Sequence, residues 1–108
     1  MADPGALSAA MDRLWAQFRP QMTERVDVLE AAARAAAADM LTKELRRSAE
    51  TEAHKLAGVL GTFGLSLGTE LAREAEAVFA SGVDAAVAAA PRLAEIAAQL
   101  QGILAAKA

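Results

Sequence analysis

Residues 51–76 read TEAHKLAGVLGTFGLSLGTELAREAE and contain the only histidine of the chain, His54, together with four of its seven glycines. If this stretch begins as a helix with about 100° per residue, its large apolar side chains fall on the side opposite His54. Gly58 and Gly61 fall within about 40° of the histidine, so the helix surface one and two turns beyond it carries no side chain. The sequence therefore predicts an exposed imidazole beside a shallow, bare groove.

Glycine inside a helix costs roughly 0.5–1 kcal/mol relative to Ala, and this chain uses Ala freely elsewhere. The two glycines beside the histidine therefore need a reason. One reason is access, because a partner backbone or a bulky anion can reach the imidazole only where no Cβ intervenes. The alternative is that Gly61 or Gly64 ends the helix. That alternative fits Gly58 less well, since apolar residues that need burial still follow it.

The composition favours a small helical protein. A chain of 108 residues is enough for one domain, 1–108, with a modest core. Ala makes up roughly a quarter of the residues, far above its ordinary share, and the β-branched and aromatic residues that favour sheets are scarce. Cysteine is absent, and one histidine without cysteine cannot build a closed metal site. We therefore expect neither a disulfide framework nor a bound metal.

The charge balance narrows the choice of partners. The net charge of −3 and a pI near 5.1 disfavour a nucleic-acid surface, which needs an excess of Lys and Arg. The N-terminus lacks the basic and apolar regions of a secretory signal. The Ala runs at 31–38 and 85–90 are well below the roughly 20 apolar residues of a membrane span. We expect a cytoplasmic protein that binds neither nucleic acid nor membrane.

Helix start and stop signals divide the chain into five predicted helices. Pro4 fits a first helical position, and Pro20 disfavours helical geometry at the residue before it. Thr42 and Asp84 are predicted N-caps, and Pro91 should kink the last helix or split off its first turns. The predicted helices span about 4–18, 20–39, 42–63, 66–80 or 69–80, and 84–105. This pattern predicts an all-α fold, an antiparallel four-helix bundle with an additional N-terminal helix.

The segment at 53–65, AHKLAGVLGTFGL, resembles the signature of histidine-containing phosphotransfer (HPt) domains, roughly H-x-L-K-G-x-x-x-x-x-G followed by L. Its GTFG portion is most similar to the phosphotransfer domain of chemotaxis-type histidine kinases. The resemblance covers about 25 central residues closely and extends over the whole chain in length and helix pattern. It is specific, because His, Leu and two Gly recur at set offsets within a predicted helical domain of the right size.

The resemblance implies roles for His54, Gly58 and Glu76. His54 matches the phospho-accepting histidine, and Gly58 matches the small residue that lets a receiver domain close over it. Glu76 matches a glutamate that some members place against the imidazole nitrogen that is not phosphorylated. Such a carboxylate would accept the Nδ1 proton, fix the tautomer and leave Nε2 with a free lone pair. Lys55 and Arg73 are the nearby cations available for the phosphoryl oxygens, with a solvated surface charge as the alternative for both.

One position departs from the family pattern. HPt domains usually have Lys three residues after the histidine, where this chain has Ala57. Either Lys55 or Arg73 replaces that cation, or phosphohistidine is less well stabilised here. The predicted partner-binding face combines five residues on the side of the histidine, namely Gly58, Gly61, Ala57, Arg47 and Thr51.

The resemblance implies a phosphotransfer intermediate of a two-component phosphorelay, without kinase activity of its own. His54 Nε2 would take a phosphoryl group from a receiver-domain aspartate or a kinase and pass it to another receiver aspartate. The partner would be the receiver domain of a response regulator or hybrid histidine kinase. Mg²⁺ would belong to that partner, so we expect this chain to bind no cofactor. We also expect it to be a monomer. A second hypothesis is an unphosphorylated helical adaptor that binds a signalling partner through the same face.

Overall fold

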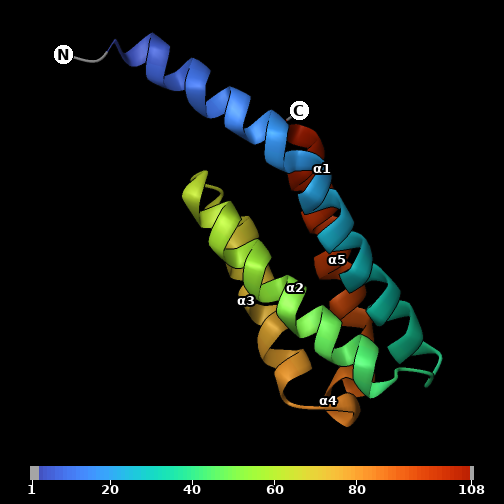
Figure 1. Cartoon of the computed structure of the whole chain (residues 1–108). Coiled ribbons are helices and arrows are strands. Elements are labelled where there is room, and N and C mark those ends of the chain that lie inside the picture. Colours follow the sequence, from blue (N-terminus) through green and yellow to red (C-terminus); the bar gives the residue numbers. More distant parts are fainter. Residues whose placement is uncertain (1–2, 108) are drawn as a thin grey trace.

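Five helices account for nearly all of residues 3–107, the part of the chain that the structure, a computed structural model, describes. Four long helices pack side by side, and a short one joins the third to the last (Figure 1). The predicted all-α bundle is confirmed. The helices are α1 (Pro4–Ala37), α2 (Lys43–Thr62), α3 (Ser66–Ala80), α4 (Val83–Ala88) and α5 (Ala90–Ala106).

The predicted break at Pro20 is wrong, because α1 is one continuous helix of 34 residues with Pro20 inside it. An interior proline removes the hydrogen bond to the carbonyl four residues earlier, here that of Ala16, and costs about 3 kcal/mol. Ala16 and Pro20 are both exposed, so the freed carbonyl lies on the solvent side of the helix. Burial of Trp15 and Met22 on either side of Pro20 holds α1 on the bundle.

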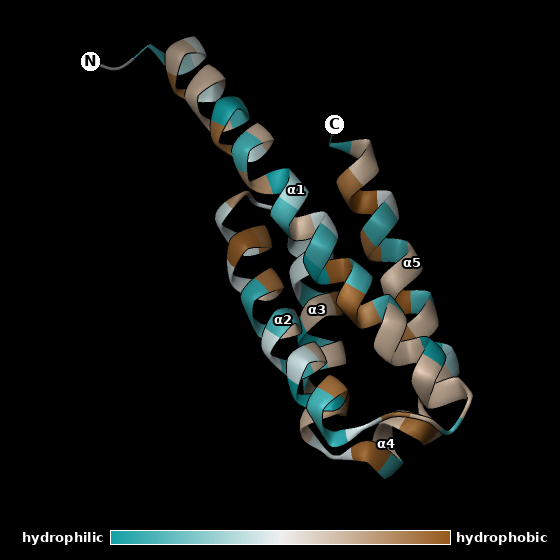
Figure 2. Ribbon diagram, turned by 45° about the vertical axis from the view of Figure 1, so that its right-hand side comes forward, coloured by the Kyte–Doolittle hydropathy of each residue, from teal (hydrophilic) through white to brown (hydrophobic). Residues whose placement is uncertain are grey.

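The predicted additional N-terminal helix is therefore the first part of α1, which projects past the other helices (Figure 1, Figure 2). Its apolar residues Leu7, Leu14 and Phe18 remain exposed. Because α1 projects in this way and the long helices lie side by side, the molecule is elongated and measures 54 × 20 × 20 Å.

The ends of α2 and α3 follow the sequence signals closely. Thr42 caps α2 as predicted, since its Oγ1 accepts a hydrogen bond from the Leu45 N–H at 3.1 Å. The chain reverses at Gly64, whose φ of +71° lies in the left-handed region that favours glycine. The Leu65 N–H then donates to the Leu60 carbonyl at 2.9 Å. A helix-ending role is thus confirmed for Gly64, whereas Gly58 lies well inside α2.

The last predicted helix is split, as the position of Pro91 indicated. α4 ends at Ala88, and Pro91 lies in the first turn of α5, where its missing N–H has no helical partner to lose. The prediction that Asp84 is the N-cap is wrong. Gly82, with φ of +111°, precedes α4 directly, so Asp84 falls within the first turn and its side chain makes no capping hydrogen bond.

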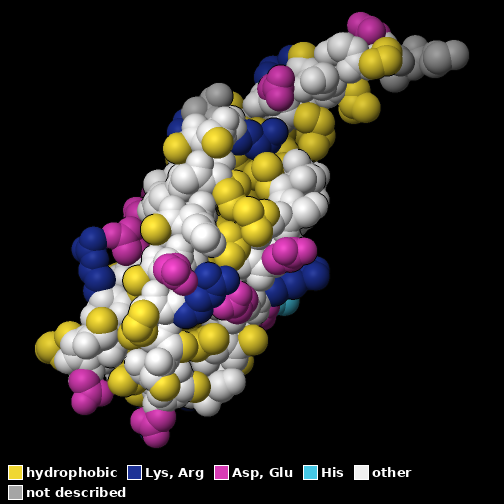
Figure 3. All heavy atoms as spheres, turned by 180° about the vertical axis from the view of Figure 1, so that it is seen from behind, with side chains coloured by type: hydrophobic (Ala, Val, Ile, Leu, Met, Phe, Trp, Pro, Cys, Tyr) yellow, Lys and Arg dark blue, Asp and Glu magenta, His cyan; other side chains and the backbone are white. Residues whose placement is uncertain are grey.

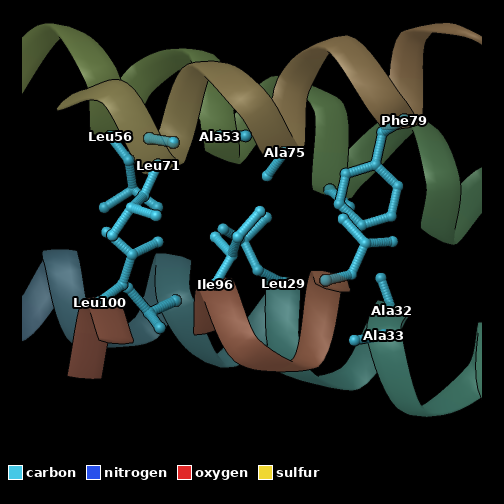
Figure 4. Packing of buried hydrophobic residues seen from close by; sticks show 14 of the residues in the cluster. Leu29, Ala32, Ala33, Ala53, Leu56, Leu71, Ala75, Phe79, Ile96 and Leu100 are labelled. Atoms are coloured by element: carbon cyan, nitrogen blue, oxygen red, sulfur yellow. The ribbon is translucent and has the colours of Figure 1, made fainter. Parts of the chain in front are cut away.

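The core fills the space between α1, α2, α3 and α5. Leucine and aromatic side chains from the four helices meet there, and alanines at the contacts let the helices approach closely (Figure 4). Burial of one such Leu or Phe side chain contributes about 1.5–3 kcal/mol, so this packing fixes the position of α3 against α2. The residues that Figure 4 labels are Leu29, Ala32, Ala33, Ala53, Leu56, Leu71, Ala75, Phe79, Ile96 and Leu100.

Candidate functional site

His54 lies in the middle of α2, on the side opposite the core. Its side chain is 75% exposed, while Leu56 and Leu60 of the same helix are completely buried. The predicted exposure of the imidazole is confirmed. Figure 3 shows the molecule from behind relative to Figure 1, and in that view the histidine is visible only at the margin, beside charged side chains.

Glu76 reaches the imidazole from the neighbouring helix α3. Its Oε2 lies 2.7 Å from Nδ1 of His54, as the resemblance implied. A second contact fixes how the antiparallel helices α2 and α3 align. Thr69, two turns before Glu76 in α3, donates a hydrogen bond to the carbonyl of Ala57 in α2 at 3.3 Å. A carboxylate oxygen can only accept, so Nδ1 carries the proton in this contact. In the neutral ring Nε2 then holds the free lone pair.

The surface of α2 beyond the histidine is bare. Apart from the adjoining backbone of α2, a Cβ at Gly58 would meet no atom of residues 3–107 within 4 Å, and a Cβ at Gly61 would meet only Thr69 Oγ1, at 3.5 Å. Neither glycine is therefore needed to avoid a clash within this part of the chain. Both leave space on the outside of the helix, on the side to which the imidazole points.

A shallow depression of about 200 Å³ surrounds the imidazole, lined by Glu50, Thr51, His54, Lys55 and Glu76. Lys55 is the one cation of this lining. Sequence reasoning missed Glu50, although its position four residues before His54 places it on the same side of the helix. Glu50 forms an ion pair with Arg46 at 3.0 Å, which offsets its charge beside the site.

Comparison of the chain with known protein families shows to which family it is related. The family model described as the Hpt domain matches residues 13–106. The chain belongs to the Hpt domain family. Members of this family carry phosphoryl groups in two-component phosphorelays, which assigns the chain to phosphorelay signalling.

One curated relative of this Hpt domain is Protein RcaC of Microchaete diplosiphon. The two are 34% identical over 68 residues, which cover 63% of this chain and 10% of RcaC. The match therefore spans only a tenth of that relative. No solved structure matches the chain significantly.

Ala57 does not belong to the exposed face of this Hpt domain, contrary to prediction. Its residue surface is 7% exposed, because α3 packs over it and Thr69 bonds to its carbonyl. An angle of about 60° from His54 places Ala57 near the exposed side of α2, but on the flank that α3 covers. We therefore expect a lysine at this position to reach the imidazole less freely than the helical wheel suggests.

The other predicted site residues are divided between the depression and its surroundings. Thr51 and Lys55 line the depression with His54. Arg73 is exposed on α3, one turn before Glu76, and is absent from that lining. Arg47 lines a separate groove nearer the start of α2. The structure thus places Lys55, and not Arg73, beside the imidazole.

Residues 3–107 contain no cluster of metal-binding side chains and no helix that could span a membrane. No group of three or more His, Cys, Asp or Glu side chains in this part of the chain is arranged to hold a metal ion. None of the described helices has the length and apolar character needed to cross a membrane.

Proposed function

We propose that Nε2 of His54 accepts a phosphoryl group from an aspartyl phosphate of a receiver domain, or from a kinase, and donates it to another receiver aspartate. The observation that carries the proposal is the 2.7 Å contact of Nδ1 with Glu76 on a ring that is 75% exposed. This contact orients the ring and leaves Nε2 free to face a partner.

In the forward step, the Nε2 lone pair attacks phosphorus in line while the bond from phosphorus to the donor carboxylate oxygen breaks. The donor aspartate leaves as a carboxylate, and the proton stays on Nδ1. The phosphorylated ring is then cationic, and the Glu76 carboxylate at 2.7 Å stabilises that charge. In the reverse step an acceptor carboxylate attacks phosphorus, the P–N bond breaks and the ring becomes neutral again.

The partner is proposed to supply the remaining groups. Catalysis of phosphoryl transfer is mostly positioning and neutralisation of charge on the phosphoryl oxygens. Mg²⁺ held by carboxylates of the receiver domain would provide most of that neutralisation, with Lys55 as the contribution of this chain. We also expect this chain to act as a monomer.

The test is incubation with a panel of phosphorylated receiver domains. We expect one phosphate per chain, stable in base and labile in acid, and no label in His54→Gln with unchanged helical circular dichroism. The side chain is exposed, so the substitution should leave the fold intact. Label that persists in His54→Gln would contradict the assignment, and binding without any label would favour the adaptor hypothesis.

Glu76 has its own expected outcome. In Glu76→Ala the ring loses the acceptor for its Nδ1 proton, so the neutral imidazole should become a mixture of tautomers and transfer should slow by about tenfold or more. Glu76→Gln keeps an acceptor oxygen and should retain the tautomer. Long-range ¹⁵N–¹H spectra of the imidazole distinguish the two variants. The same tautomer in Glu76→Ala as in the wild type would show that Glu76 does not orient the ring.

A further inference from the structure

A cluster of cations lies at the start of α2, away from the imidazole. Lys43, Arg46 and Arg47 line a groove of about 390 Å³ between the start of α2 and the segment 81–84. Asp84 is the one acid in that lining. This groove therefore carries a local positive excess on a chain whose net charge is −3.

Two of these three cations are free to meet a partner. Arg46 is half-buried, donates to the Phe79 carbonyl at 2.8 Å and pairs with Glu50 at 3.0 Å. Lys43 and Arg47 are exposed, and neither forms an ion pair with another residue of the described range 3–107. We call Lys43 and Arg47 the basic pair.

The basic pair lies on the same side of α2 as the histidine. At about 100° per residue, Lys43 and Arg47 fall within about 20° of His54. At about 1.5 Å per residue they lie about 16 Å and 10 Å from it along the helix axis. Gly58 and Gly61 continue the same side in the other direction. Glu50 also lies between the basic pair and the imidazole, but its charge is offset by Arg46. The exposed side of α2 thus carries a positive excess before the imidazole and no side chain at the two glycines after it.

We infer that the basic pair binds an acidic rim of the receiver domain, about 10–16 Å from the phospho-accepting aspartate of that domain. This inference rests on the proposed function and adds the orientation of the partner. The acidic rim of the receiver lies over the start of α2. The part of the receiver that comes closest to α2 lies over Gly58 and Gly61. A receiver turned by half a revolution would bring that rim over glycines, where no cation attracts it.

Opposite charges at the rim of an interface mainly raise the association rate. Such steering is worth about 10- to 1,000-fold at low ionic strength, and it disappears as salt shortens the screening length to about 3 Å at 1 M. The basic pair should therefore select among receiver domains by the charge of their rim, in addition to the chemistry at His54.

The experiment measures the second-order rate constant of transfer from one phosphorylated receiver domain as a function of NaCl concentration. We expect Arg47→Glu to lower this constant about tenfold at low salt, with the difference vanishing near 1 M. Lys43→Glu should act in the same direction. Arg13→Glu is the matched control, because Arg13 is exposed on the projecting part of α1. It makes the same change in net charge and should alter the rate less than about twofold.

Two results would overturn the inference: equal effects of Arg47→Glu and Arg13→Glu, or a loss in Arg47→Glu that persists at 1 M NaCl. Labelling of the wild-type protein by phosphoramidate, a small phosphoryl donor, tests His54 without any receiver domain. Failure of that labelling would count against the proposed function itself. If the wild-type protein is labelled but Arg47→Glu and Arg13→Glu lower the rate constant equally, only the docking orientation is refuted.

Discussion

The two sides of α2 differ in what they contribute to the molecule. On the buried side, Leu56 and Leu60 are fully enclosed, and the alanines beside them let neighbouring helices come close. On the exposed side, His54 lies one turn from Gly58, where a Cβ would meet no atom of residues 3–107 within 4 Å except the adjoining helix backbone. The buried side packs side chains into the core, whereas on the exposed side each helix-interior glycine lowers stability by roughly 0.5–1 kcal/mol relative to Ala. The fold and the proposed chemistry are thus separated across one helix.

The largest effect on stability should come from the buried side. Leu60→Ala removes a completely buried side chain and should lower the free energy of unfolding by about 2–5 kcal/mol. Leu67→Ala is the matched control, since Leu67 is 59% exposed and its loss should cost less than about 0.5 kcal/mol. Urea denaturation measures both. Because Leu67 belongs to the neighbouring helix α3, equal costs would show that burial does not determine the loss of stability at these positions.

On the exposed side, Gly58→Gln should impair transfer without harming the fold. A side chain there would hold a receiver domain away from Nε2, and a displacement of about 1 Å can cost about 100-fold in rate. Stability should stay equal or rise by up to about 1 kcal/mol. Gly102→Gln is the control, because Gly102 is a helical glycine of α5 with equally open surroundings. Unchanged transfer in Gly58→Gln would exclude this surface as the docking site.

Ala57 lies on the boundary between the two sides, and its substitution should have the smallest effect on the phosphohistidine chemistry. Ala57→Lys restores the residue usual in the family, but α3 covers this position. We expect a loss of about 1–3 kcal/mol in stability from overpacking, and less than about tenfold change in phosphohistidine lifetime. Ala98→Lys, on the exposed surface of α5, controls for the added charge. A lifetime gain beyond tenfold would show that the lysine reaches the phosphoryl group after all.

Local signals in the sequence predicted much of this fold. Thr42 and Gly64 mark the limits of α2 because a cap and a left-handed residue depend only on neighbouring atoms. Pro20 was misjudged because its cost depends on whether the freed carbonyl of Ala16 meets water. Asp84 was misjudged because Gly82 starts the helix two residues earlier. The cost of Pro20 therefore depends on tertiary context, whereas the start of α4 is a local choice between Gly82 and Asp84, both of which are residue types that can cap a helix.

The candidate site was predictable in its centre and less so at its edges. Periodicity placed His54 on the exposed side, and family resemblance brought Glu76 to it. A helical wheel gives the angle of a side chain but not the position of the neighbouring helix, which is why Ala57 was placed on the surface. The choice between Lys55 and Arg73 likewise required the packing of α3 on α2, since only Lys55 lines the depression.

The elongated shape has a consequence for solution spectroscopy. The four long helices run roughly along the 54 Å axis (Figure 1), and amide N–H bonds in a helix lie nearly parallel to its axis. Rotation about the long axis, the faster tumbling motion, therefore hardly reorients these bonds. Transverse ¹⁵N relaxation should be uniformly faster in the long helices than in equally rigid turns at 38–42 and 63–65. A relaxation analysis that treated the molecule as a sphere would mistake this orientation effect for internal motion in the turns.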